Sequence, residues 1–331
     1  MKTVDISASV NARRVTGGVD NGLMALHPMK HTWAREVWQV MNANNWRPAE
    51  VDLSRDIKEY PLLSEGEKRM YDKSLAFLSN LDGIQFNNLM DNIGSHISSP
   101  EIRMCISRQC FEEANHVDSY ATLIEAISAD PAEVYMTFER DGILAHKNKF
   151  ILRQSELLGT EYSGHNFALA LIANICLEGI YFYSGFLNFY TLARMGKMLG
   201  SADLIRFIQR DEETHLELFA KILESHQEEA PEIYTDEFWV KAAEIISQAT
   251  QLEIEWGKHT ISGGVLGLTD VIVSQHIMSL ADKRLARIGR PAMYGVKNPV
   301  PWVEKFSSIN GSKSNFFEAK VKSYSVGTLA W

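Results

Sequence analysis

Hydrophobic positions along this chain recur with the roughly 3.6-residue spacing of α-helices, and the Val, Ile and Thr alternation of β-strands is scarce. Helix-start patterns agree with that spacing. Ser64 and Glu67 form a capping-box pattern, and Thr235 precedes an acidic first turn. Ser99 stands directly before Pro100, a residue favoured in the first helical turn. We therefore predict an all-α fold. The expected helices span 64–95, 100–128, 164–194, 200–227, 235–261 and 265–289, with shorter pieces over 28–43 and 131–157.

The 331 residues are enough to bury a large hydrophobic core without disulfide bonds. No stretch is typical of an interdomain linker, and no repeat of fixed period is present. Residues 1–22 are polar, and residues 308–331 lack a clear helical period. We therefore expect one helical domain over 23–307, flanked by two flexible tails.

Charge and cysteine usage narrow the class of protein. The formal net charge of −9 argues against a nucleic-acid or anionic-membrane binder, because such proteins need a basic face. The three cysteines, Cys105, Cys110 and Cys176, form no Cys-x-x-Cys pair. The first residues lack the apolar core of a signal peptide. Together these features predict a cytoplasmic protein.

One apolar segment, residues 167–193, is long enough to span a bilayer. However, Glu178 lies in its middle, with Asn174 and Asn188 on either side, and a carboxylate in mid-bilayer is costly. We therefore interpret the segment as the central helix of a soluble bundle and expect no membrane association. This interpretation places a glutamate in the protein core, where it requires a partner.

Two short motifs, Glu113-x-x-His116 and Glu212-x-x-His215, each place a carboxylate and an imidazole on one face of a helix. A single copy is expected by chance, but two copies on separate long helices are informative. With Glu178 they nearly complete the ligand set of ferritin-like dimetal bundles, in which two helices give one carboxylate each and two others give Glu-x-x-His. We therefore predict a buried dinuclear metal site.

The remaining carboxylate should lie on the helix before Glu113, where Asp72, Asp82 and Asp91 are candidates. Asp82 lies in an apolar stretch where a lone acid is costly to bury, but spacing alone does not choose between Asp82 and Asp91. Four carboxylates and two neutral imidazoles balance two divalent cations, and such donors suit iron or manganese. Tyr120 projects from the same helix face as Glu113, so its phenol is placed to lose an electron and a proton beside the metals.

These motifs resemble those of a known family, the small, radical-generating subunit of class I ribonucleotide reductase. The resemblance covers about residues 30–327. It is carried by NNWRPAEVDLSRD (44–56), RQCFEEANHVDSY (108–120), ICLEGIYFYSGF (175–186), IQRDEETH (208–215), NPVPW (298–302) and SYSVG (323–327). It implies a ferritin-like helical bundle that forms a homodimer.

The resemblance selects Asp82 among the candidate aspartates and assigns the metal ligands. The implied ligands are Asp82, Glu113 and His116 for one ion, and Glu178, Glu212 and His215 for the other. Two iron ions are expected, with a manganese–iron or a dimanganese pair as alternatives. A stable tyrosyl radical is implied on Tyr120, inside an apolar pocket that excludes water and reductants. The implied pocket residues are Phe182, Phe186 and Ile208.

Further residues match positions that carry the radical away from the metals. Trp46, Asp211 and His116 match a hydrogen-bonded relay toward the surface. Tyr324 matches the tail tyrosine that passes the radical to a separate large, catalytic subunit, and Glu318 matches a tail glutamate associated with that step. The expected apolar anchors of the tail on the large subunit are Leu329 and Trp331.

The implied function is that of the small subunit of ribonucleoside-diphosphate reductase, an oxidoreductase that reduces ribonucleotides to deoxyribonucleotides when its large subunit is present. A manganese site would imply an activating flavoprotein as a further partner. Three alternatives remain open at this point. Another dimetal enzyme, such as a desaturase-like or ligand-binding oxidase, has no use for Trp46 or Tyr324. An iron-storage protein forms a very large cage from shorter chains, and a purely structural helical partner needs no metal.

Overall fold

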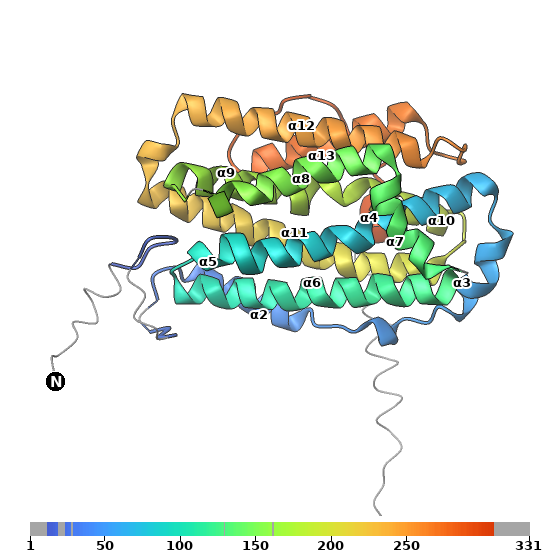
Figure 1. Ribbon diagram of the computed structural model, residues 1–331, viewed down its shortest axis with the longest axis horizontal. Coiled ribbons are helices and arrows are strands. Elements are labelled where there is room, and N and C mark those ends of the chain that lie inside the picture. Colours follow the sequence, from blue (N-terminus) through green and yellow to red (C-terminus); the bar gives the residue numbers. More distant parts are fainter. Residues whose placement is uncertain (1–11, 19–23, 28, 129, 161, 308–331) are drawn as a thin grey trace, which may run out of the picture.

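The computed structural model is a bundle of long helices that run along the longest axis of the molecule (Figure 1). It describes residues 12–18, 24–27, 29–128, 130–160 and 162–307. Within these ranges there is no β-strand, and β pairing is limited to an isolated bridge between Thr16 and Ile97. The predicted all-α fold is therefore confirmed. The predicted tails fall largely outside the described residues, so the domain boundaries stay predictions.

The described residues form α-helices of very different lengths, joined by short turns. The α-helices are α2 (Trp33–Ala43), α3 (Ser54–Glu59), α4 (Glu65–Asn87), α5 (Gly94–His96), α6 (Pro100–Ile127), α7 (Pro131–Arg140), α8 (Gly142–Thr160), α9 (Gly164–Cys176), α10 (Tyr183–Arg194), α11 (Leu199–Glu229), α12 (Asp236–Thr260), α13 (Asp270–Arg287) and α14 (Val303–Ser307). Two segments, η3 (Asn88–Ile93) and η4 (Leu177–Tyr181), are π-helical. The 3-10 turns are η1 (Pro48–Glu50), η2 (Tyr60–Leu62) and η5 (Pro231–Ile233).

The predicted helix starts are confirmed where a side chain caps the helix. The Ser64 hydroxyl accepts from the Glu67 amide, and the Glu67 carboxylate accepts from the Ser64 amide, which completes the capping box of α4. The Thr235 hydroxyl accepts from the Phe238 amide at the start of α12. Ser99 precedes α6 as expected, but its hydroxyl contacts the ring of His31 instead of a helix amide.

Three predicted helix boundaries are wrong for local reasons. The helix expected over 131–157 is two helices, because the Asp141 carboxylate accepts from two amides that begin α8. The helix expected from residue 265 begins at Asp270, since Gly267 adopts a φ of +88° and Thr269 caps the new helix. The helix expected from residue 28 begins at Trp33, because amides just before it bond to Glu101 instead.

The apolar segment around Glu178 is the core of the bundle. The run Gly164–Arg194, which comprises α9, η4 and α10, is the one described helix long and apolar enough to cross a membrane, and 94% of its most apolar window is buried inside the protein. Helices α4, α8, α11 and α12 pack against it, and α4 and α11 also pack against α6. The segment is therefore a core helix, as the soluble interpretation predicted.

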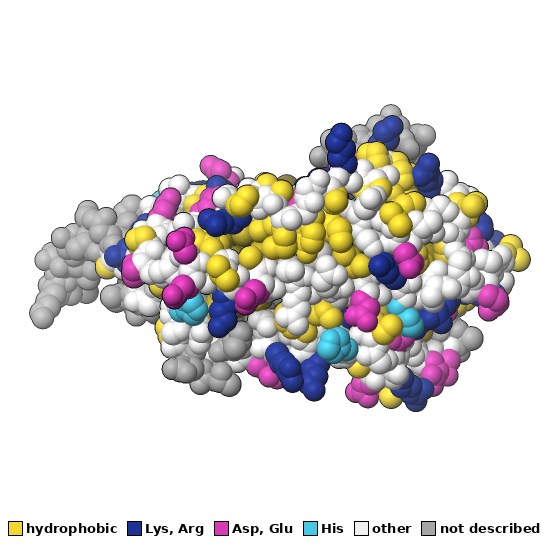
Figure 2. All heavy atoms as spheres, turned by 90° about the horizontal axis from the view of Figure 1, so that it is seen from above, with side chains coloured by type: hydrophobic (Ala, Val, Ile, Leu, Met, Phe, Trp, Pro, Cys, Tyr) yellow, Lys and Arg dark blue, Asp and Glu magenta, His cyan; other side chains and the backbone are white. Residues whose placement is uncertain are grey.

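Helices α8, α12 and α13 cover one side of this core segment and separate it from solvent. Figure 2 shows this side of the molecule, where apolar side chains gather in a band between charged groups. Leu152 on α8, Val240 on α12 and Val271 on α13 are among the exposed apolar side chains of these helices. The site described next lies on the other side of the core segment, between α4, α6 and α11.

Candidate metal centre

Six titratable side chains from four helical segments meet in the centre of the bundle. All six side chains are fully buried, and they form two overlapping groups of potential metal ligands. The first group is Asp82 on α4, Glu113 and His116 on α6, and Glu212 on α11; the second is Glu113, Glu178 on η4, and Glu212 and His215 on α11. Within each group the donor atoms lie within 4.8 Å of one another. The structure therefore brings together all six residues expected from the sequence.

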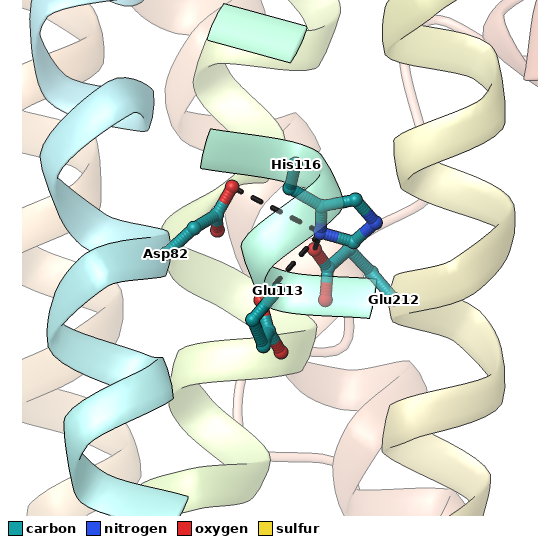
Figure 3. A group of neighbouring side chains, drawn as sticks. All are labelled: Asp82, Glu113, His116 and Glu212. Carbon is teal, nitrogen blue, oxygen red and sulfur yellow. Dashed lines mark ion pairs between the residues drawn. The ribbon is translucent and has the colours of Figure 1, made fainter. Parts of the chain in front are cut away.

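The first group surrounds Nδ1 of His116 (Figure 3). This nitrogen lies 3.1 Å from Oε1 of Glu212, 3.5 Å from Oε2 of Glu113 and 3.9 Å from Oδ2 of Asp82. Asp91, the alternative that spacing left open, is exposed, and Asp72 accepts a hydrogen bond from Tyr60. Among the candidate aspartates, Asp82 therefore lies at the cluster.

The second group surrounds Nδ1 of His215. This nitrogen lies 3.0 Å from Oε2 of Glu212, 3.3 Å from Oε1 of Glu113 and 3.5 Å from Oε2 of Glu178. Glu113 and Glu212 thus each direct one oxygen to His116 and the other to His215. These two carboxylates therefore face both halves of the cluster, and either half could draw on their oxygens to hold a cation.

The cluster contains buried donor atoms that no protein group satisfies. Atoms without a hydrogen-bond partner are Oδ1 and Oδ2 of Asp82, Oε2 of Glu113, Oε2 of Glu178, Oε1 of Glu212 and Nδ1 of His116. Buried polar atoms are normally paired, since leaving them unpaired costs about 1–3 kcal/mol each. Oxygen and imidazole donors are the ligands that iron and manganese accept. The residues present therefore fit a pair of such ions.

The pKa shifts within the cluster are consistent with a cation site. Burial, together with the carboxylates of Glu113 and Glu212, raises the pKa of both Asp82 and Glu178 well above their usual values. Burial opposes the charged imidazole of His116, but the neighbouring carboxylates outweigh it and raise the pKa of that ring. Without a metal, these shifts favour the protonated forms of Asp82 and Glu178, and bound cations would favour their ionised forms instead.

Each histidine is oriented by an acid from the opposite helix. Nε2 of His116 on α6 lies 3.3 Å from Oδ2 of Asp211 on α11. Nε2 of His215 on α11 lies 3.0 Å from Oε2 of Glu112 on α6. A carboxylate on the outer nitrogen leaves Nδ1 of each ring directed at the cluster, as outer partners of metal-binding histidines do. Sequence reasoning missed Glu112, although an acid directly precedes Glu113 just as Asp211 precedes Glu212.

Amide side chains hold the remaining oxygen of Glu178. Nε2 of Gln109 donates to its Oε1 at 2.5 Å, and Gln85 donates to the same oxygen. Asn174, one turn earlier in the core segment, donates to it at 3.5 Å and accepts from Gln85 at 2.9 Å. Oε2 is therefore directed into the cluster. Sequence reasoning missed both glutamines, because an amide at a helical position carries no signal of its own.

Comparison with known proteins identifies the family. A family model described as "Ribonucleotide reductase, small chain" matches residues 23–299. The chain belongs to this family. It is 37% identical over 325 residues to the ribonucleoside-diphosphate reductase subunit beta of Treponema pallidum, covering 95% of this chain and 91% of that protein. The ribonucleoside-diphosphate reductase subunit beta of Chlamydia pneumoniae is 34% identical, and the match covers 92% of this chain and 91% of that protein.

Solved structures agree with this result. The ribonucleotide reductase R2 subunit from Clostridium botulinum superposes with a TM-score of 0.87 at 35% identity, covering 89% of this chain and 94% of that one. The expected family, the ferritin-like bundle and the assignment as a ribonucleoside-diphosphate reductase small subunit, an oxidoreductase, are therefore confirmed. Family membership also favours the reductase subunit over a desaturase-like oxidase or an iron-storage protein.

In the reductase small chain, Trp46 extends the line that begins at His116. Its indole Nε1 donates to Oδ2 of Asp211 at 2.6 Å, the same oxygen that faces His116. The Trp46 ring also lies against the His116 ring, with 6.2 Å between centroids, and stacks on Phe207 at 5.1 Å. Arg210 donates to the other Asp211 oxygen at 3.2 Å. A continuous set of contacts thus connects the cluster with the α2–η1 loop.

Tyr120 lies on α6, two turns after Glu113, and is completely buried. Its hydroxyl has no hydrogen-bond partner. Burial, reinforced by Asp82, Glu212 and Glu113, raises the pKa of this phenol well above its usual value, so the ring is neutral. The three residues expected to form an apolar pocket share its core and are also buried: Phe182, Phe186 and Ile208. Tyr324, Glu318, Leu329 and Trp331 lie outside the described residues.

Proposed function

We propose that this reductase small chain holds a pair of transition-metal ions at the six clustered side chains and stores an oxidising equivalent on Tyr120. The observation that carries the proposal is the set of unpaired, fully buried donor atoms converging from four helical segments. Asp82, Glu113 and His116 would hold one ion. Glu178, Glu212 and His215 would hold the other.

The bound ions would supply the oxidising power, and the surrounding residues would control where it goes. We propose two iron ions, with manganese–iron and dimanganese pairs as the alternatives that the same donors accept. Tyr120 is suited to oxidation because it is buried beside the cluster and its hydroxyl has no competing partner. Phe182, Phe186 and Ile208 would keep water and reductants away from the ring.

The oxidising equivalent would leave through the contacts that connect the cluster with Trp46. The indole N–H of Trp46 and the ring of His116 share one oxygen of Asp211. A change of charge at one ring would therefore alter the hydrogen bond to the other. Tyr324 in the tail would then pass the equivalent to a cysteine of the large subunit, where ribonucleotides are reduced. The functional unit would be a cytoplasmic homodimer bound to that subunit, with an activating flavoprotein if manganese is used.

Paramagnetic resonance tests this proposal. Protein reconstituted with iron(II) in air and then frozen should contain two metal ions per chain and show a tyrosyl-type signal. Tyr120→Phe should keep both ions and lose the signal, while Tyr190→Phe, which alters another buried tyrosine of the core, should retain it. Retention of the signal in metal-loaded Tyr120→Phe protein would refute the assignment. Metal analysis of protein from its native host distinguishes iron from manganese.

The relay is tested separately with the large subunit present. Tyr324→Phe should leave the metal content and the tyrosyl signal unchanged and abolish ribonucleotide reduction. Unchanged turnover would overturn the role proposed for this residue and favour an enzyme that reacts at its own metal centre. Size measurement of the wild-type protein should show a dimer, whereas a large cage would contradict the proposed assembly.

A further inference from the structure

The segment that carries Glu178 departs from α-helical geometry. Residues Leu177–Tyr181 form the π-helical segment η4 between α9 and α10. A change to i+5 spacing leaves backbone groups at its ends without their regular helical partners, and such π segments are energetically unfavourable unless other contacts support them. Because η4 is completely buried, water does not satisfy these groups. The neighbouring helices therefore have to supply partners.

Arg284 on α13 supplies one of them. Its guanidinium Nε donates to the carbonyl oxygen of Gly179 at 2.9 Å, and Nη2 lies 3.4 Å from the carboxylate of Glu213. The approach depends on the glycine, because a Cβ at residue 179 would lie 2.9–3.1 Å from three atoms of the Arg284 side chain. The side chain is buried, and its contact with Gly179 is directly beside Glu178.

A buried ion pair supplies two further partners for backbone groups of this segment and of the start of α10. Lys147 on α8 and Glu253 on α12 are both fully buried and in direct contact. Nζ of Lys147 lies 3.5 Å from the carbonyl oxygen of Tyr181, at the end of η4. Oε1 of Glu253 accepts from the amide of Ser184 at 2.9 Å, in the first turn of α10. The ion pair therefore contacts the chain on both sides of the point where π-helical spacing returns to α-helical spacing.

We propose that Arg284, Lys147 and Glu253 form a backbone clamp that holds the π segment in the conformation that directs Glu178 toward the metal pair. The three side chains are positioning residues, since they contact the backbone of η4 and α10 and none contacts the cluster. Stability alone does not explain the ion pair of Lys147 and Glu253, because a buried ion pair can often be replaced by apolar residues of similar volume without loss of stability. The proposal rests on Glu178 being a metal ligand, as proposed above.

Two double variants distinguish the loss of the backbone contacts from the loss of the two buried charges. Lys147→Met with Glu253→Leu removes both charges and the polar contacts of this pair with the backbone of Tyr181 and Ser184. Lys147→Met with Glu253→Gln also removes both charges but leaves an oxygen that accepts from the Ser184 amide. Both double variants avoid an unpaired buried charge, which is the usual cause of misfolding after such changes. A difference between them therefore reports on the backbone contact.

The first readout uses the metal-free protein. Amide hydrogen exchange in residues 177–186 should become faster in the Met/Leu variant and stay close to wild type in the Met/Gln variant. Asp56→Asn is the matched control, because Asp56 is likewise a fully buried carboxylate that accepts from amides at a helix start, here Gly200 and Ser201 of α11. The control should loosen the start of α11 and leave 177–186 unchanged.

The second readout is manganese(II) binding followed by titration and paramagnetic resonance. In the Met/Leu variant, one of the two ions should bind about 10–100-fold more weakly, the range found when outer contacts of a metal site are removed. The other ion should bind normally. Arg284→Met should act in the same direction and Arg284→Lys, which retains a donor for Gly179, should restore binding, so the clamp can be tested even if one variant fails to fold.

Unchanged exchange in 177–186 together with unchanged affinity for both ions in the Met/Leu variant and in Arg284→Met would overturn the clamp. Failure of the proposed function gives a different result. Wild-type protein that binds no pair of manganese ions would overturn the metal centre, whereas the hydrogen exchange of the metal-free variants would still decide whether the three side chains hold η4.

Discussion

Nε2 of His215 on α11 bonds at 3.0 Å to the carboxylate of Glu112 on α6, one residue before the cluster residue Glu113. The reciprocal contact joins His116 on α6 with Asp211 on α11, one residue before Glu212. Each helix therefore orients the imidazole that the other contributes. Arg108 supports Glu112 through a 3.0 Å contact with its second oxygen, much as Arg210 supports Asp211.

Replacement of Glu112 by Gln should weaken metal binding at the half of the cluster that contains His215. The amide keeps the size of the side chain but removes the charge that orients the imidazole, and loss of such an outer partner typically costs about 10–100-fold in metal affinity. Titration with manganese(II) measures the change. Asp118→Asn, an exposed acid on the same helix, is the control and should bind as wild type.

Trp46→Phe should separate radical formation from radical transfer. The variant lacks the indole N–H that bonds to Asp211, so both ions and the tyrosyl signal should persist while turnover with the large subunit is lost. The metal-free variant should also lose at least about 1.5 kcal/mol of unfolding free energy, because a hydrogen bond to a charged group disappears. Trp33→Phe removes a similar bond to Ser225 and should leave turnover intact. Normal turnover of Trp46→Phe would rule out this route.

Tyr120→Phe should not destabilise the metal-free protein. The Tyr120 hydroxyl is buried without a partner, and an unsatisfied group of this kind costs about 1–3 kcal/mol, so its removal should leave the unfolding free energy unchanged or raise it by up to that amount. Tyr190→Phe provides the contrast, because its hydroxyl donates to Gln209 at 2.6 Å and its removal should cost about 0.5–1.5 kcal/mol. Chemical denaturation measures both. A clear loss of stability in Tyr120→Phe would reveal a partner for its hydroxyl.

The segment before α2 should be anchored less firmly at alkaline pH. His31 is buried between Glu101 and Glu229, and although burial opposes its charge, hydrogen bonds to these carboxylates raise its pKa above the usual value. The stabilisation is therefore fully present below the unfolded pKa of about 6.5 and is lost as pH rises through the higher folded value. Hydrogen exchange of residues 29–33 should become faster between pH 6 and pH 9.

The two carboxylates that contact His31 do not change their charge over that range. The same contacts lower the pKa of Glu101 and of Glu229 to about 2, so their own stabilisation is present above about pH 4.3 and is lost only toward pH 2. Lys30 pairs with Glu229 at 2.8 Å, and Arg13 lies 3.7 Å from Glu101. In the His31→Gln variant, the hydrogen exchange of residues 29–33 should accordingly change with pH only as much as the intrinsic exchange rate of an amide does. A residual transition in that variant would point to another group.

Much of the site was predictable because its ligands follow helical rules. The paired Glu-x-x-His motifs and Glu178 specify the cluster by residue type and spacing alone, whereas Asp82 could be separated from Asp91 only through the family resemblance. The structure supplies the missing reason, since Asp91 is exposed.

The supporting contacts could not be predicted, because they depend on which helices face each other. Gln109 resembles any polar residue of a long helix until the fold places it against Glu178 on another segment. The π segment has no distinctive composition, and Lys147 and Glu253 are far apart in sequence. The break at Asp141 did have a local signal, since Asp followed by Gly142 is typical of a turn or a helix start.

The most apolar segment of the protein, Gly164–Arg194, is covered by helices that come both before and after it in the chain. Helices α11 and α12 are made by the ribosome only after this segment, so a nascent chain exposes it before its cover exists. During that interval the segment meets the length and hydropathy criteria by which a membrane-insertion machinery selects its substrates. The burial of this segment therefore depends on helices that are synthesised after it.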